Sequence, residues 1–221
     1  MRIGIDARLI DETGVGRYIR NLIGELAKQD AINEYVIFLT PRSYSGFVLP
    51  NIRWSKVVVD VHWHTVSEQI IMPRVFDAAH VDIVHIPYHN PPILYGGRVV
   101  ITIHDLTILH FTTGKATTLP LALYHLKRLG YWLELWVGLR RAKKIIAVSQ
   151  ATKQEIVDHF HIPPGKISVT YEGVDPMIMT HGQHTAKRLL PEPYFLYVGN
   201  AYPHKNIETL IEGFTLFMGS I

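Results

Sequence analysis

Cysteine is absent from the 221-residue chain, which excludes disulfide bonds and thiolate catalysis and fits a cytoplasmic location. Charge of one sign is hardly in excess, since 22 Lys and Arg stand against 19 Asp and Glu, so the composition predicts no nucleic-acid partner. The N-terminus reaches the acidic Asp6 too early for a secretory signal peptide. What is present is 48% hydrophobic content, enough for the core of a globular α/β protein.

Metal-ligand spacing is also lacking. The pairs His62 and His64, and His85 and His89, are not joined into a compact motif, and no acidic metal motif occurs. We therefore expect no metal and no cofactor, and we assign these histidines to the surface or to a cleft.

Apolar runs of strand length alternate with stretches of helical periodicity. The predicted strands are 3–6, 35–40, 57–61, 82–86, 99–103, 144–148, 167–171 and 194–199. The predicted helices are 15–28, 66–79, 119–141, 150–160 and 206–217. Continuously apolar strands between helices indicate a doubly wound, mostly parallel sheet of Rossmann-like α/β type, covered on both faces.

The composition changes near the end of the chain. We predict a Rossmann-like domain over 1–176, a linker over 177–193, and the first strand–helix unit of an incomplete second domain over 194–221. One strand and one helix cannot enclose a core, so we expect a fragment of a longer protein. The apolar residues of 194–217 need a cover, which makes self-association through this segment a further expectation.

A glycine-bearing loop follows the first strand and leads into a helix. Glycines let backbone N–H groups approach a ligand, and a helix N-terminus favours negative charge, so Gly14, Gly16 and Arg17 are candidates for binding a phosphate. The third glycine of the dinucleotide fingerprint is missing and the loop is long, which argues against a nicotinamide cofactor. An ordinary strand-to-helix connection remains the alternative.

Polar residues follow several of the other predicted strands. They are His104, Asp105, Ser149, Glu172 and Gly173. Ligands of doubly wound sheets bind beyond the carboxyl ends of the strands, so these residues predict a site. A helix cap is the simpler role for Ser149, and also for Asp105.

These motifs, in this order, resemble the N-terminal half of a GT-B glycosyltransferase, the large retaining family 4 (group 1). The resemblance rests on residues 14–18, 102–105, 147–152, 172–175 and 197–206. It implies two Rossmann-like domains that face a cleft, the first holding mainly the acceptor and the second mainly a nucleotide-sugar.

Carried over to this chain, the resemblance assigns roles to single residues. It places the backbone of Gly14 and Gly16 at the donor diphosphate, and His104 at the transferred sugar as the catalytic residue. Gly199 and Lys205 would also bind the diphosphate. The ammonium group of Lys205 suits this task, because its positive charge offsets the negative charge of the departing nucleotide. No metal is needed for this step.

The chain departs from the family pattern in two places. His204 stands where many relatives carry arginine, and a later motif of two glutamates has no counterpart. We therefore expect little activity from the chain alone. The implied reaction moves a hexose, for example mannose, from a nucleotide-sugar to a glycan or lipid-linked acceptor. A nucleotide-sugar epimerase, or a non-catalytic binding or assembly module, are the alternatives.

The predicted helix 119–141 carries many leucines together with tryptophans, and it ends in a basic segment. Lys127, Arg128 and Glu134 interrupt it too often for a membrane span. The segment 119–144 fits peripheral contact with the inner face of a membrane, and a core helix with a solvated basic end is the alternative.

Overall fold

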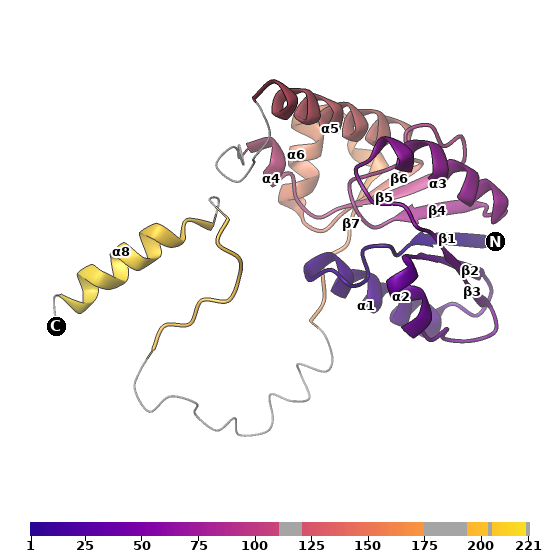
Figure 1. Cartoon of the computed structure of the whole chain (residues 1–221), viewed down its shortest axis with the longest axis horizontal. Helices are drawn as coiled ribbons and strands as arrows, with labels where there is room; N and C mark the ends of the chain where they lie inside the picture. Colours follow the sequence, from indigo (N-terminus) through magenta and orange to yellow (C-terminus); the bar gives the residue numbers. More distant parts are fainter. Residues whose placement is uncertain (111–120, 175–193, 203–204, 220–221) are drawn as a thin grey trace. The chain divides into compact units, whose positions relative to one another are not determined.

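The computed structural model describes residues 1–110, 121–174, 194–202 and 205–219. The chain divides into two compact units (Figure 1). The main unit comprises Met1–Leu106 and Leu126–Gly173, and the second comprises Thr107–His125 and Val174–Ile221. The predicted linker lies outside the described residues, so the predicted domain boundaries stay predictions.

The main unit is built on one seven-stranded sheet in which all neighbouring strands run parallel. The strands are β1 (Arg2–Asp6), β2 (Glu34–Leu39), β3 (Trp54–Val58), β4 (Ile83–Ile86), β5 (Val99–Ile103), β6 (Lys144–Ala147) and β7 (Ile167–Val169). Their order is β3-β2-β1-β4-β5-β6-β7. The predicted doubly wound α/β fold is confirmed, and the strand order reverses between β1 and β4.

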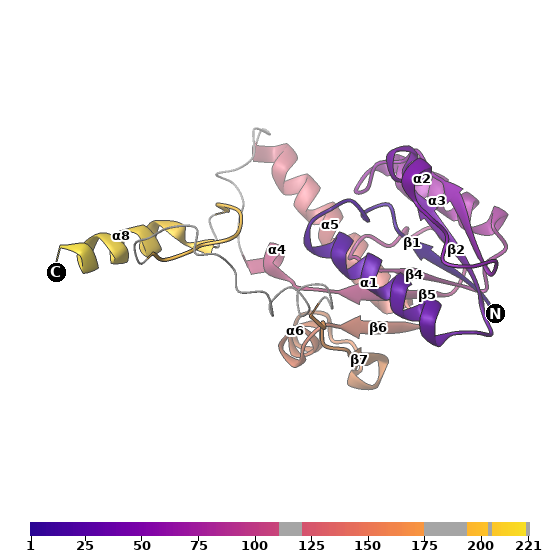
Figure 2. The same ribbon diagram turned by 90° about the horizontal axis from the view of Figure 1, so that it is seen from below.

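Among the described residues, helices follow most of the strands, but none lies between β4 and β5, and α8 comes after the last strand. The helices are α1 (Gly14–Gln29), α2 (Pro41–Gly46), α3 (Val66–Ala78), α4 (Thr107–His110), α5 (Leu121–Arg141), α6 (Gln150–Phe160), the 3-10 turn η2 (Pro164–Lys166) and α8 (Ile207–Met218). Right-handed crossovers put α1 on one face of the sheet and α3 and α5 on the other, as Figures 1 and 2 show.

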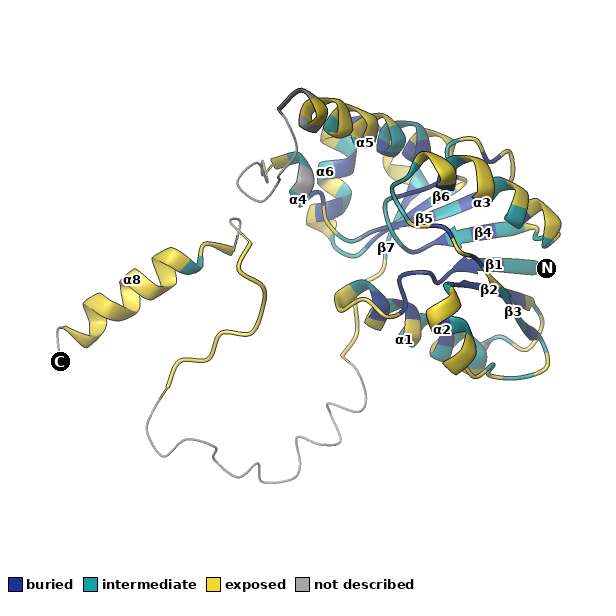
Figure 3. Cartoon of the chain, in the orientation of Figure 1, coloured by how far each residue is buried: buried dark blue, intermediate teal, exposed yellow. Residues whose placement is uncertain are grey.

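Alternation along the strands explains why both faces are apolar. On one face Ile5 and Ile37 pack with Ile19 of α1 in a buried cluster. On the other face the ring of Phe38 meets Phe76 of α3, with centroids 4.9 Å apart. Figure 3 shows buried strands between helices whose outer faces are exposed. Both layers of core therefore hold the carboxyl edge of the sheet in place.

The position of β3 differs from the prediction of a strand over 57–61. Pairing with β2 sets the observed strand, because Trp54 stands opposite Tyr35 and their rings stack with centroids 4.1 Å apart. Val59 and Val61 are buried all the same, although they lie beyond the strand. Their apolar side chains belong to the core although their backbone forms a loop. A prediction from hydrophobic periodicity assigns such a segment to a strand.

The second unit corrects a prediction. Residues 194–199 form no strand but an exposed, irregular segment. A lone strand leaves its backbone unpaired, and no other strand of the described second unit lies beside it. The predicted helix is present as α8, which is exposed beyond its first residue, Ile207 (Figure 3), and Phe195 contacts Phe214 and Phe217.

None of the described helices combines the length and the apolar character needed to cross a membrane.

Candidate functional site

The candidate site lies at the carboxyl edge of the sheet, around the point where the strand order reverses. The loop after β1 leads to the glycines of α1, the loop after β4 begins at Pro87, and His104 follows β5 directly. Open α/β sheets bind their ligands at this place. The topology thus brings together polar segments that are far apart in the sequence.

The two glycines at the start of α1 have different surroundings. A Cβ atom at Gly14 would meet nothing within 4 Å, whereas one at Gly16 would lie 2.4 Å from the carbonyl oxygen of Ile10. Gly16 therefore lets α1 pack directly on the loop that precedes it. Gly14 is exposed, and the N-cap residue Thr13 makes no side-chain bond to the first-turn N–H groups. Arg17, in the first turn of the helix, is exposed as well.

A buried ion pair holds the loop after β1. Arg8 donates from Nε to Asp6 Oδ1 at 2.9 Å and from Nη2 to Asp6 Oδ2 at 2.6 Å. The same Nη2 donates to Glu68 Oε1 of α3 at 2.5 Å, and all three side chains are at most 5% exposed. No pattern in the sequence indicates Glu68, which lies 60 positions beyond Arg8.

Glu68 extends this pair to two further loops. It accepts a bond from Asn90 Nδ2 at 2.7 Å, after β4, and one from the backbone N–H of His64 at 2.6 Å, before α3. Burial raises the pKa of Glu68, and the nearby Arg8 works in the opposite direction. The buried ion network of Asp6, Arg8 and Glu68 thus fixes three loops at the carboxyl edge.

Hydrogen bonds link one side chain each from α1, β5 and β4. Thr102 Oγ1 of β5 lies 3.2 Å from the Tyr18 hydroxyl and 2.8 Å from His85 Nε2. Burial, and then the charge of His104, lowers the pKa of His85 to about 4, so that His85 is neutral near pH 7. The Tyr18 ring meets the His104 ring edge to face, with centroids 4.8 Å apart. Tyr18 was missed in the sequence, although it lies one helical turn beyond Gly14.

His104 is held at both ring nitrogens. Nδ1 lies 2.8 Å from Glu172 Oε1, and Nε2 lies 3.1 Å from the carbonyl oxygen of Pro87. Both partners are acceptors, so the ring makes both bonds only when each nitrogen carries a proton. The His104 side chain is 15% exposed and that of Glu172 is 51% exposed. The structure therefore joins two predicted site residues into a hydrogen-bonded dyad.

Ser149 acts as a helix cap. Its Oγ accepts the N–H of Thr152 at 3.0 Å, which confirms the predicted start of α6. Thr152 Oγ1 in turn donates to the backbone carbonyl of His104 at 3.2 Å. Ser149 thus supports the site through the first turn of α6.

The remaining candidates are exposed. Asp105 follows His104, and Gly173 follows Glu172 after β7. Gly199 and Lys205 belong to the second unit, where the N–H of Lys205 donates to the carbonyl of Tyr202 at 2.8 Å. Their roles stay predictions, and His204 lies outside the described residues.

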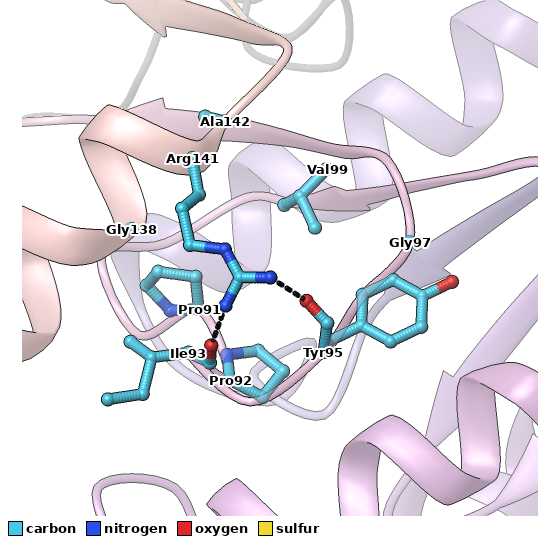
Figure 4. A pocket seen from close by; sticks show the side chains of 9 residues that line it. All are labelled: Pro91, Pro92, Ile93, Tyr95, Gly97, Val99, Gly138, Arg141 and Ala142. Carbon is cyan, nitrogen blue, oxygen red and sulfur yellow. Dashed lines mark hydrogen bonds between the residues drawn. The ribbon is translucent and has the colours of Figure 1, made fainter.

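A separate small cavity lies under the loop that follows β4 (Figure 4). It measures about 20 Å³, room for about one water molecule. Arg141 crosses it and donates to the backbone carbonyls of Ile93 and Tyr95. The lining residues are Pro91, Pro92, Ile93, Tyr95, Gly97, Val99, Gly138, Arg141 and Ala142. This cavity fastens a loop to α5 and is too small for a sugar.

Within the described ranges, no three His, Cys, Asp or Glu side chains are grouped as a metal ion would require.

A parallel sheet of this strand order, with helices on both faces, defines a doubly wound α/β domain of Rossmann-like type. The model of Glycosyltransferase Family 4 matches residues 13–177, and the chain belongs to this family. Its fold is accordingly the Rossmann-like N-terminal half of the GT-B type.

Two curated relatives carry related names. The chain is 23% identical over 210 residues to O-antigen chain mannosyltransferase RfbU of Salmonella typhimurium, covering 90% of this chain and 54% of the relative. It is 25% identical over 231 residues to O-antigen chain mannosyltransferase B of Escherichia coli, covering 92% and 56%. The chain therefore spans about half the length of the curated relatives it matches.

Among solved structures, a glycosyltransferase from Rickettsia africae aligns with a TM-score of 0.49 at 16% identity, covering 84% of this chain and 46% of that one.

Proposed function

We propose that this chain provides the acceptor side of a retaining hexosyltransferase that uses a nucleotide-sugar donor. The observation that carries the proposal is the fixed position of His104 at the switch-point edge, beside α1, in a member of family 4. The names of the two curated relatives support mannose as the sugar and a growing polysaccharide, free or lipid-linked, as the acceptor.

In this proposal His104 donates a hydrogen bond to a hydroxyl of the transferred sugar. In this step Nε2 exchanges the carbonyl oxygen of Pro87 for the sugar hydroxyl, whereas Nδ1 keeps its bond to Glu172. The bond to the Glu172 carboxylate keeps the imidazole ring in one orientation. His104 therefore positions the anomeric carbon.

The first turn of α1 faces the donor diphosphate in this scheme. Its uncapped N–H groups and the exposed Gly14 leave room for an anion, and Arg17 adds a positive charge. The family resemblance adds Gly199 and Lys205 as further diphosphate ligands of the whole enzyme, and the proposed step needs no metal. The bond from the anomeric carbon to the diphosphate oxygen breaks as the acceptor hydroxyl attacks from the same face. The hydroxyl proton passes to the leaving phosphate oxygen.

We also propose that α5 rests on the inner face of a membrane. Leu126 and Leu129 are more than 60% exposed, and the exposed Lys127 lies between them. Apolar side chains beside basic ones suit an anionic lipid surface. Co-sedimentation with anionic vesicles tests this at low salt: L126S/L129S should bind less than wild type, whereas absence of wild-type binding would refute the membrane contact.

The transfer reaction is tested in a fusion, because the chain spans about half the length of its relatives. The second half of the Escherichia coli relative is joined after Gly173, and the fusion receives GDP-mannose and a lipid-linked saccharide in the presence of EDTA. We expect mannosylated product with the donor's anomeric configuration. An epimerised sugar nucleotide formed without acceptor, or a product of inverted configuration, would contradict the proposal.

A further inference from the structure

Four aromatic side chains from three segments meet next to the dyad of His104 and Glu172. His64 precedes α3, Tyr88 and His89 follow β4, and Tyr131 lies on α5. The ring centroids are 3.7 Å apart for Tyr88 and His89, 5.2 Å for His89 and Tyr131, and 5.5 Å for His64 and His89. This His–Tyr cluster adjoins the candidate site, because Tyr88 directly follows Pro87, the backbone partner of His104.

Two polar atoms of the cluster are buried without a hydrogen-bond partner. They are His64 Nδ1 and the Tyr131 hydroxyl. The nearest carboxylate oxygen recorded for His64 Nδ1 belongs to Glu134 at 3.8 Å, which is too far for a hydrogen bond. Leaving such atoms unpaired costs stability, so their retention calls for an explanation, and a ligand that pairs with them supplies one.

The backbone of His64 is built to hold this arrangement. Its φ angle is 58°, in the left-handed region that a residue with a side chain seldom adopts. Its N–H is bonded to Glu68, a member of the buried ion network. The network therefore keeps His64 in an unfavourable conformation that places its ring against His89 and Tyr131. Strain of this kind gathers at binding sites.

Three members of the cluster, His89, Tyr88 and Tyr131, are uncharged near pH 7. Burial, followed by the charges of His64 and His104, lowers the pKa of His89 to about 3, so this ring is uncharged near pH 7. Burial raises the pKa of Tyr88 to about 12 and also raises the pKa of Tyr131. Neutral hydroxyl and imidazole groups beside aromatic faces suit a sugar ring, whose C–H face packs on the aromatics while its hydroxyls form hydrogen bonds. A phosphate would instead call for a cationic partner.

We propose that the His–Tyr cluster is a subsite for a neutral saccharide residue of the acceptor. The inference rests on the proposed function in taking that saccharide to be the acceptor. Both unpaired atoms are covered by protein here, so a small turn of the rings accompanies binding. The Tyr131 hydroxyl and His64 Nδ1 then gain hydroxyl partners from the sugar.

Tyr131→Phe gives a sharp test, since it removes only a hydroxyl that has no protein partner. Binding of methyl α-mannoside and of mannobiose is measured by saturation-transfer NMR and titration, with inorganic phosphate as the anionic probe. We expect Tyr131→Phe to weaken saccharide binding about fivefold or more without loss of stability. Tyr35→Phe is the matched control: its hydroxyl donates to Asp30 at 2.6 Å, so stability falls and saccharide binding stays.

The outcomes separate the subsite from the reaction. Unchanged saccharide binding in Tyr131→Phe, no binding by the wild-type chain, or tighter binding of phosphate than of either saccharide would overturn the subsite. In the fusion, loss of transfer in His104→Ala together with an unchanged acceptor KM in Tyr131→Phe would leave the reaction standing and reject the subsite. Saccharide binding that depends on Tyr131, in a fusion that never transfers sugar, would support the subsite and reject the proposed reaction.

Discussion

His104 Nδ1 and Glu172 Oε1 lie 2.8 Å apart, although the two residues are 68 positions apart in the sequence. The bond reaches from the end of β5 to the segment after β7, across the intervening strand β6. It makes the orientation of the candidate catalytic ring depend on a residue that is itself half exposed. We therefore expect the carboxylate to matter more for the proposed reaction than for the stability of the fold.

Glu172→Gln tests this role of the carboxylate. The amide keeps the size of the side chain but loses the charge that pairs with the ring, so we expect the fusion's kcat to fall about tenfold, ~1.4 kcal/mol. Stability should hardly change, because a half-exposed ion pair contributes little. Glu25→Gln, in the exposed pair with Lys28, is the control. A kcat equal to wild type in Glu172→Gln, at every pH tested, would remove Glu172 from the site.

The buried ion network predicts a large effect on stability. Arg8→Met leaves two buried carboxylates without their cation, and we expect a loss of about 3–5 kcal/mol in the free energy of unfolding. Urea denaturation measures it. Lys28→Met breaks an ion pair whose side chains are more than half exposed, and it should leave stability near wild type. A similar stability for both variants would show that the network does not hold the loops.

The two glycines at the start of α1 should respond differently to substitution by alanine. Gly16→Ala would push a methyl group into the carbonyl oxygen of Ile10, so we expect a loss of about 1–3 kcal/mol in urea denaturation. Gly14→Ala meets open space and should fold normally, while its added methyl group hinders the diphosphate and raises the donor KM of the fusion. A stability loss in Gly14→Ala, or none in Gly16→Ala, would contradict these surroundings.

Two buried histidines predict an acid-sensitive fold. Burial lowers the pKa of His85 to about 4 and that of His89 to about 3, from 6.5. The unfolded chain therefore takes up these protons first, and stability falls as the pH drops from 6.5 towards 4. Above pH 6.5 both states are neutral at these groups and the effect vanishes. His85→Gln and His89→Phe should each reduce the slope by about one proton. An unchanged slope in both variants would refute this linkage.

Most of the fold could be predicted from local sequence patterns. Apolar runs such as Val99–Ile103 and the cap at Ser149 could be predicted, because strand period and capping chemistry are local. The start of β3 at Trp54 depends on pairing with β2, which no local pattern contains. The irregular segment 194–199 is as apolar as a strand, and only the lack of a neighbouring strand in the described part of its unit distinguishes it.

In the candidate site, too, local patterns predicted single residues but not the contacts between distant ones. His104 and Glu172 were predicted because each follows a strand, and parallel strands bring their ends together. Their bond, and the link from Arg8 to Glu68, depend on side-chain geometry across more than 50 residues of sequence. The unpaired atoms of the His–Tyr cluster are visible only once three segments are packed together.

The most direct measurement compares His104→Ala with wild type in the fusion, following mannose transfer, unfolding and saccharide binding together. We predict that transfer falls about 100-fold, as expected when a group that stabilises the transition state is lost. The free energy of unfolding and the binding of methyl α-mannoside should stay close to wild type. Transfer within about threefold of wild type, a loss of less than ~1 kcal/mol, would contradict the account.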